Sequence, residues 1–307
     1  MIHGVINIHK EKGYTSHDVV AKLRGILKQK KIGHTGTLDP DATGVLPVCL
    51  GKATKLCDML TDKNKTYETV MLLGKVTDTQ DISGSVLSEA DTNQLTVEAV
   101  ETAIRSFVGP YMQVPPMYSA LKVNGKKLYE LAREGIEIER AARPVEIFDI
   151  QILKVDLPRV RMRVSCSKGT YIRTLCHDIG AKLGCGACME KLIRTKVSRF
   201  ELEDSITLEE VQNLIKEGQL DAYVIPIDQM FADYETLHLK EEFASFGYNG
   251  NSISTEHLQG KGRFQDQQKV RIYDHLGTFI GVYTYQDKFQ IFKIEKMFFE
   301  RENNAIR

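Results

Sequence analysis

The sequence is most constrained between Gly33 and Val48, where Gly33, Gly36, Pro40 and Gly44 surround the carboxylate of Asp39. Glycine reaches backbone conformations that other residues avoid, and proline pushes the residue before it toward an extended conformation. Pro40 therefore restrains Asp39, while the glycines let the loop turn sharply. A loop of this kind suggests that the Asp39 side chain is aimed at a target. Asp39 is our candidate nucleophile or base, and the alternative is an aspartate that only stabilises a turn.

The chain has 307 residues, enough for one large domain or two. No apolar run approaches the ~20 residues that cross a membrane, and the first residues do not resemble a secretory signal, so we expect a cytoplasmic protein. Six cysteines in a chain this long do not suggest a disulfide scaffold, and only Cys185 and Cys188 are spaced as a metal-binding pair. We expect buried thiols rather than zinc.

The formal net charge is zero, but the charges are unevenly distributed. Residues 159–200 carry ten Lys or Arg and two Asp or Glu, whereas residues 201–256 carry two Lys or Arg and thirteen Asp or Glu. A basic block beside an acidic one suggests an anionic ligand for part of the chain. Folding can equally interleave the two blocks into an ordinary solvated surface, so charge alone leaves both interpretations open.

Hydrophobic periodicity predicts helices and strands in mixed order. A helical period of about 3.6 residues is found in segments 16–27, 96–107, 172–183 and 207–215. Ser16, Thr96 and Thr207 are the expected helix caps. Strands are expected in segments 67–73, 147–155 and 160–166, and on both sides of Gly277. Because regular βαβ alternation is missing, this order favours an α+β fold.

A proline-bounded segment at about residues 109–144 is expected to fold on itself as an insertion. Pro115-Pro116 interrupts regular structure, residues 123–126 have the Asn-Gly signature of a hairpin turn, and a short helix at 127–133 is closed by Gly135. Segments of this type often carry function. A boundary near residues 226–232 then predicts two domains, a larger one at 1–230 and a small β-rich one at 231–307.

Several common motifs are missing from the sequence, among them the phosphate-binding loop, the H-E-x-x-H zinc motif and the G-x-S-x-G nucleophile elbow. Residues 39–44 partly mimic a calcium-binding loop, but Leu50 stands where that loop needs a glutamate. The residues therefore imply neither a metal nor a nucleotide cofactor.

The loop around Asp39 resembles the signature of the TruB family of pseudouridine synthases, which modify the uridine at position 55 in the T-loop of transfer RNA. Other stretches resemble further family motifs in the right order: Gly4 to Ser16, Lys65 to Tyr67, Gly74 to Gly84, Val114 to Gly125, Ser165 to Leu175 and Leu192 to Thr195. Each motif alone is weak, but together they cover roughly residues 4–200. The last part resembles an RNA-binding PUA domain more loosely, through its hairpin.

The resemblance implies a fold and a reaction. The expected fold is a catalytic domain with a central, mainly antiparallel mixed sheet, flanking helices and a thumb-like insertion, followed by a small PUA-like domain. The expected reaction converts uridine to pseudouridine after base flipping, with Asp39 attacking either C6 of the base or C1′ of the sugar. Because the change is an isomerisation, no cofactor is expected.

The resemblance also implies roles for three aromatic side chains. Tyr67 would stack on the flipped uracil, His34 would fill the gap left in the T-loop, and Tyr171 would lie in the pocket. Stacking returns about 1–3 kcal/mol per base, which offsets the few kcal/mol that flipping costs. The alternatives are a tyrosine that belongs to the core and a histidine that is satisfied within its loop.

Three further residues complete the implied site. Arg173 would pair with Asp39 and keep it ionised and oriented, Asp81 would join this polar network, and Leu192 would contact the substrate. Arg173 can instead face a phosphate, and Asp81 can cap a turn.

The implied partner is the T-arm stem-loop of transfer RNA, bound by a monomer without a metal or a membrane. One alternative is a related enzyme guided by a second RNA within a ribonucleoprotein. Another is a non-catalytic protein that binds and folds transfer RNA.

Overall fold

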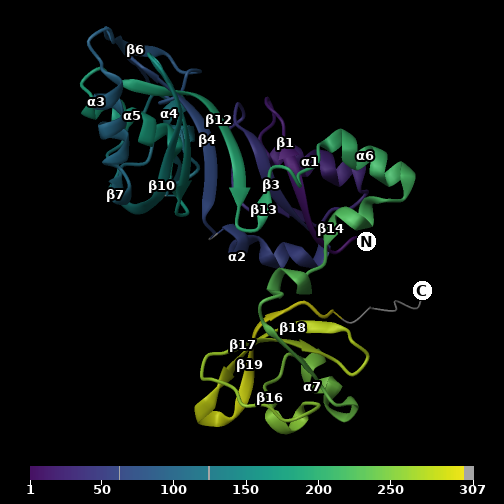
Figure 1. Cartoon of the computed structure of the whole chain (residues 1–307). Coiled ribbons are helices and arrows are strands. Elements are labelled where there is room, and N and C mark those ends of the chain that lie inside the picture. The colour runs from purple at the N-terminus through teal and green to yellow at the C-terminus, as the bar shows by residue number, and fades with distance from the viewer. Residues whose placement is uncertain (62, 124, 301–307) are drawn as a thin grey trace.

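The computed structural model describes residues 1–61, 63–123 and 125–300 of the chain. Figure 1 shows a long twisted sheet with helices packed along it and, below it, a smaller sheet formed by the last part of the chain. The helices are α1 (Ser16–Ile26), α2 (Cys57–Thr61), α3 (Val97–Arg105), α4 (Leu128–Arg133), α5 (Ile172–Lys182), α6 (Leu208–Glu217) and α7 (Ala244–Tyr248). Short 3-10 turns lie at Gly51–Leu56, Leu220–Tyr223, Asp228–Phe231, Glu241–Phe243, Thr255–His257 and Asp287–Phe289.

The large sheet is mixed but mainly antiparallel. Its strands follow the order β14-β1-β3-β12-β4-β11-β10-β7, with β2 beside β3 and β13 beside β12. Strand β12 runs parallel to β3 and antiparallel to β4. The bounds are β1 (Gly4–Lys10), β2 (Ile32–His34), β3 (Thr43–Leu50), β4 (Lys65–Leu73), β7 (Gly109–Gln113), β10 (Arg143–Asp156), β11 (Arg159–Cys166), β12 (Ala187–Val197), β13 (Phe200–Glu201) and β14 (Val224–Ile225).

Alternation along β11 produces the core of the large sheet, as the sequence predicts. Every second residue of this strand is fully buried, and α5 packs its apolar side against the same cluster. The intervening Arg161 and Arg163 point the other way and both form ion pairs with Glu68 of β4. The buried residues of β11 and α5 are Val160, Met162, Val164, Cys166, Ile172, Leu175, Cys176 and Ile179.

The cap of α1 differs from the prediction. Thr15, not Ser16, is the N-cap, because its side chain accepts from the Asp18 N–H while the Asp18 carboxylate binds the Thr15 N–H. Ser16 is the first helical residue, and its hydroxyl accepts from the Leu38 N–H at 2.9 Å. The hydroxyl expected to cap the helix therefore supports the loop that carries Asp39. The predicted caps Thr96 and Thr207 are confirmed.

Both ends of the inserted segment belong to the large sheet, because β7 pairs with β10. Between them the chain forms the hairpin β8 (Lys122–Val123) and β9 (Lys126–Lys127), followed by α4. A small apolar cluster of Met117, Leu128 and Leu131 holds this part together. The middle of the predicted turn, Asn124, lies outside the described residues. A separate hairpin, β5 (Lys75–Thr77) and β6 (Val86–Glu89), carries Asp81 on its connection.

The second sheet has the strand order β15-β17-β18-β19-β16 and contains the predicted hairpin through Gly277. Its strands are β15 (Glu235–His238), β16 (Ile253–Ser254), β17 (Lys269–Tyr273), β18 (Phe279–Gln286) and β19 (Ile291–Met297). Val282 and Phe298 share an apolar cluster with Val5 and Val45 of the large sheet. The division into domains at 230 and 231 stays a prediction, because one cluster spans both sheets. Within the described residues, no helix has the length and apolar character to cross a membrane.

Candidate active site

The loop that carries Asp39 joins β2 to β3 and is held where β3 runs parallel to β12. Gly44 of β3 and Arg194 of β12 are partners in this pairing. Gly44 has a φ of +107°, in the left-handed region that favours glycine. Strand β12 therefore fixes the C-terminal end of the loop.

Two buried cationic side chains bind main-chain carbonyls of the Asp39 loop. Arg194 is 1% exposed, and its guanidinium donates to the Val45 carbonyl at 2.7 Å and to the carbonyls of Gly36 and Thr37 at 3.4 Å each. The Lys10 ammonium donates to the Pro40 carbonyl at 3.1 Å, and burial lowers the pKa of Lys10 to about 8. Backbone carbonyls thus replace water around both charges.

Neither cation was predicted as a site residue, although both lie in stretches that match family motifs. The sequence gives no signal for these two roles, because the groups that the cations bind are not side chains. Main-chain carbonyls bind Lys10 and Arg194, and a carbonyl is present in every residue of any sequence.

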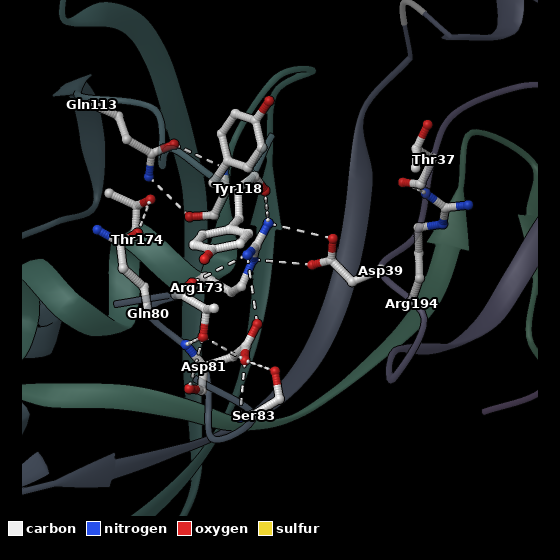
Figure 2. Close-up of polar contacts among 12 residues, drawn as sticks. Thr37, Asp39, Gln80, Asp81, Ser83, Gln113, Tyr118, Arg173, Thr174 and Arg194 are labelled. Atoms are coloured by element: carbon white, nitrogen blue, oxygen red, sulfur yellow. Dashed lines mark hydrogen bonds and ion pairs between the residues drawn. The ribbon is translucent and has the colours of Figure 1, made fainter. Parts of the chain in front are cut away.

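The expected ion pair between Arg173 and Asp39 is present (Figure 2). The Arg173 Nε lies 3.0 Å from one carboxylate oxygen of Asp39, and Nη2 donates to the other at 3.3 Å. Arg173 lies in the first turn of α5 and its side chain is 5% exposed, whereas the Asp39 side chain is 37% exposed. The arginine is fixed in the protein, and the carboxylate it holds is open to a ligand.

Arg173 has further partners that fix its orientation. Its guanidinium donates to the Thr79 carbonyl at 3.1 Å and to the Tyr118 carbonyl at 2.8 Å. Nη1 also lies 3.5 Å from a carboxylate oxygen of Asp81. Three separate segments therefore meet at one guanidinium: the Asp39 loop, the β5–β6 connection and the inserted segment.

The electrostatics of Asp39 reflect its partial enclosure. Burial raises the pKa of the Asp39 carboxyl above the ordinary value, Arg173 opposes this rise, and the negative charge of Asp81 adds to it. The carboxyl is thus a stronger base than a solvated aspartate.

Asp81 joins the network and also caps a turn, so both of its expected interpretations apply. One carboxylate oxygen accepts from the Thr79 hydroxyl at 2.8 Å and from the Ser83 N–H at 3.0 Å, which fixes the turn. The other oxygen faces Arg173. The turn holds Asp81 in place against the guanidinium.

Tyr67 and Leu192 pack against the Asp39 loop. Tyr67 is 8% exposed in β4 and packs in a cluster with Leu38 and Leu192. Its hydroxyl interacts with the Arg194 guanidinium, and burial raises the pKa of Tyr67 to about 12. The tyrosine is therefore both part of the core and a neighbour of the Asp39 loop.

Tyr171 and His34 lie at two edges of the site. Tyr171 is the N-cap residue of α5, half-buried, and burial raises the pKa of its hydroxyl. His34 ends β2, its ring lies 5.1 Å from that of His17, and its Nδ1 accepts from the Gly36 N–H at 3.3 Å. Burial lowers the pKa of His34 to about 4, so this side chain is neutral at physiological pH.

The basic block at 159–200 is largely engaged within the protein. Besides Arg173 and the two arginines bound to Glu68, Arg159 pairs with Glu190 and Lys196 pairs with Glu201. These pairs mean that the block by itself does not identify an RNA-facing surface. In the described part of the chain, no three His, Cys, Asp or Glu side chains are arranged to hold a metal ion.

The chain is similar to known proteins over most of its length. A model of the TruB family pseudouridylate synthase N-terminal domain matches residues 24–172, and one of the tRNA pseudouridylate synthase B C-terminal domain matches residues 173–232. A tRNA pseudouridine synthase B of Lachnoclostridium phytofermentans is 51% identical over 97% of this chain and 100% of its own length. One of Clostridium tetani is 46% identical over 92% and 95%.

The fold is shared with solved structures. A chain in a crystal structure of a Cbf5-Nop10-Gar1 complex is 27% identical, with a TM-score of 0.71, and the match covers 97% of this chain and 86% of that one. The expected α+β fold is thereby confirmed. The chain belongs to the TruB family of pseudouridine synthases.

Proposed function

We propose that this chain isomerises uridine to pseudouridine in transfer RNA, at position 55 of the T-loop, with Asp39 as the nucleophile. The observation that carries the proposal is the Asp39–Arg173 pair, in which a buried guanidinium holds an accessible carboxylate through two contacts. A carboxylate oriented in this way is suited to attack an electrophilic carbon. The full-length curated relatives carry the name of this activity.

The reaction requires that one bond break and another form between the same two rings. Asp39 attacks C6 of the base or C1′ of the sugar, the N1–C1′ bond breaks, and the uracil turns within the site. C5 then bonds to C1′, the bond between Asp39 and the substrate breaks so that the carboxylate is free again, the C5 proton leaves, and N1 carries a proton in the product. Atoms balance without a redox partner, because the product is an isomer of the substrate.

The residues around Asp39 have matching roles in this scheme. Arg173 orients the carboxylate and balances its charge, and Asp81 fixes Arg173 from the other side. Tyr67 supports the flipped base, while Tyr171 and Leu192 line the pocket that encloses it. Neutral His34 offers a flat ring that can occupy the space of the extruded nucleotide without the cost of burying a charge.

The substrate fragment that fits this proposal is the T-arm stem-loop. The inserted segment at 109–144 approaches the site through the Tyr118 carbonyl, so an RNA hairpin in contact with Asp39 would also meet this segment. We propose that the protein acts as a monomer in the cytoplasm, where transfer RNA is modified.

A guide-RNA-dependent enzyme with the same catalytic motifs is the alternative. Relatives named tRNA pseudouridine synthase B are 43–51% identical over nearly the whole chain, against 27% for the chain from the Cbf5-Nop10-Gar1 complex. This difference favours action on free transfer RNA.

The test is conversion of uridine in unmodified transfer RNA by the purified chain, followed by mass spectrometry and chemical mapping of pseudouridine. We expect pseudouridine at position 55 with the native chain and none with Asp39→Asn. The matched control is Asp41→Asn, since Asp41 is an exposed aspartate two residues further along. Conversion by Asp39→Asn at the native rate, or at other positions only, would falsify the proposal.

A further inference from the structure

Gln113, the last residue of β7, makes two hydrogen bonds to the main chain of Tyr171. Its side-chain carbonyl accepts from the Tyr171 N–H at 2.8 Å, and its amide group donates to the Tyr171 carbonyl at 3.0 Å. The glutamine is 2% exposed, and Figure 2 shows its amide directed at this part of the site. Both functional ends of one side chain are therefore used on a single residue.

The residue that Gln113 holds begins α5. Tyr171 is the N-cap, but its own side chain makes no capping hydrogen bond. Its carbonyl also accepts from the Leu175 N–H in the first helical turn. Because Gln113 binds the backbone, it fixes the direction in which the Tyr171 side chain leaves the chain, and it fixes the start of the helix that carries Arg173 two residues later.

Gln113 also stands at the root of the inserted segment. In the pairing of β7 with β10 its partner is Arg143, so the two ends of the segment meet at this position. A few residues further along, the Tyr118 carbonyl accepts from Arg173 at 2.8 Å. One segment thus contacts both members of the Tyr171–Arg173 pair.

We propose that Gln113 is a positioning residue that couples the inserted segment to the Tyr171–Arg173 pair. This inference rests on the proposed function and adds a residue that touches neither the RNA base nor Asp39. A rigid two-bond contact transmits the position of the segment to the guanidinium that orients the nucleophile. RNA bound by the inserted segment is then placed at a site in which Arg173 and Asp39 are correctly oriented.

The first test is Gln113→Met, which keeps the length of the side chain and removes both hydrogen bonds. We expect the single-turnover rate of pseudouridine formation to fall about 10- to 100-fold, while the Kd for the T-arm hairpin stays within about twofold. The matched control is Gln94→Met, at an exposed glutamine, with an unchanged rate. Circular dichroism at the assay temperature verifies that both variants are folded.

The second test separates alignment from simple packing. In Gln113→Glu, the introduced carboxyl reproduces both hydrogen bonds only when protonated, because its O–H then donates to the Tyr171 carbonyl. We expect the ratio of its rate to the native rate, both measured at the same pH, to rise as the pH is lowered from about 8 to about 5.5. Burial raises the pKa of a carboxyl, so the introduced group becomes protonated in this range. Nearby titratable or charged groups are Tyr171, Arg143 and Tyr111, whose hydroxyl donates to Asp178, and all occur in both proteins.

Three outcomes would overturn the inference: a native rate in Gln113→Met, a loss of RNA affinity with an unchanged rate, or a pH-independent ratio for Gln113→Glu. Each is read against native conversion of transfer RNA in the same assay. If the native chain converts no uridine, the proposed function itself fails. If it does and Gln113→Met equals it, only the role of Gln113 fails.

Discussion

Gly44 and Arg194 lie so close across β3 and β12 that a Cβ on Gly44 would stand 2.2 Å from the Arg194 carbonyl oxygen. The contact is with main chain, which cannot move aside as a flexible side chain can. It joins the end of the Asp39 loop to the residue whose guanidinium binds that same loop. The conformation of the Asp39 loop and the position of the Arg194 guanidinium therefore depend on the same contact.

Replacement of Gly44 by alanine is expected to destabilise the protein and misplace the loop. The positive φ and the backbone contact together should lower the free energy of unfolding by about 2–3 kcal/mol. Urea denaturation measures this change. Gly25→Ala in α1 is the control, because a Cβ there meets open space and alanine favours a helix. Equal stability of the two variants would contradict the explanation.

Arg194→Lys should preserve the positive charge but lose the hydrogen bonds that fix the conformation of the Asp39 loop. A lysine cannot reach the carbonyls of Gly36, Thr37 and Val45 at once, because it lacks the planar fork of the guanidinium. We expect a loss of about 1–3 kcal/mol in unfolding free energy and a slower single-turnover rate. Arg199→Lys serves as the exposed control. A native rate in Arg194→Lys would show that the loop is held by other contacts.

As the pH is lowered, the activity should begin to fall at a higher pH than it would if Asp39 had the pKa of a solvated aspartate. Nucleophilic attack needs ionised Asp39, and burial raises the pKa of this carboxyl, so protonation begins earlier as the pH falls. Arg173→Met removes the charge that opposes the rise, and its rate profile should shift to still higher pH. Single-turnover rates across the acidic range measure both profiles, and Arg199→Met, at an exposed arginine, should leave the native profile in place. A shift of the Arg173→Met profile to lower pH would oppose this account.

The arginines of β11 should contribute little to RNA affinity. Arg161 and Arg163 already share Glu68 on the exposed side of the sheet. We expect Arg161→Gln with Arg163→Gln to change the Kd for transfer RNA by less than about twofold, and to leave the slope of log Kd against log salt unchanged. A slope reduced by about two would instead place both arginines on phosphates.

Much of the fold follows from local patterns. The alternation along β11, the stripe of α5, the caps Thr96 and Thr207 and the hairpin through Gly277 are present as predicted. Each depends on residues within a few positions of one another. The α1 cap lies one residue before the predicted one, because Thr15 forms reciprocal hydrogen bonds with Asp18, while the Ser16 hydroxyl binds the Leu38 N–H.

The sequence by itself determined the candidate nucleophile, because Pro40 and the glycines around Asp39 constrain the backbone locally. The family resemblance also pointed to Arg173, although 134 positions separate it from Asp39. Only the tertiary structure decided how the loop and this pair are held, because Lys10, Arg194 and Gln113 act on main-chain groups. A carbonyl or N–H has no signature of its own in a sequence, so its partner becomes visible only when the chain has brought the two together.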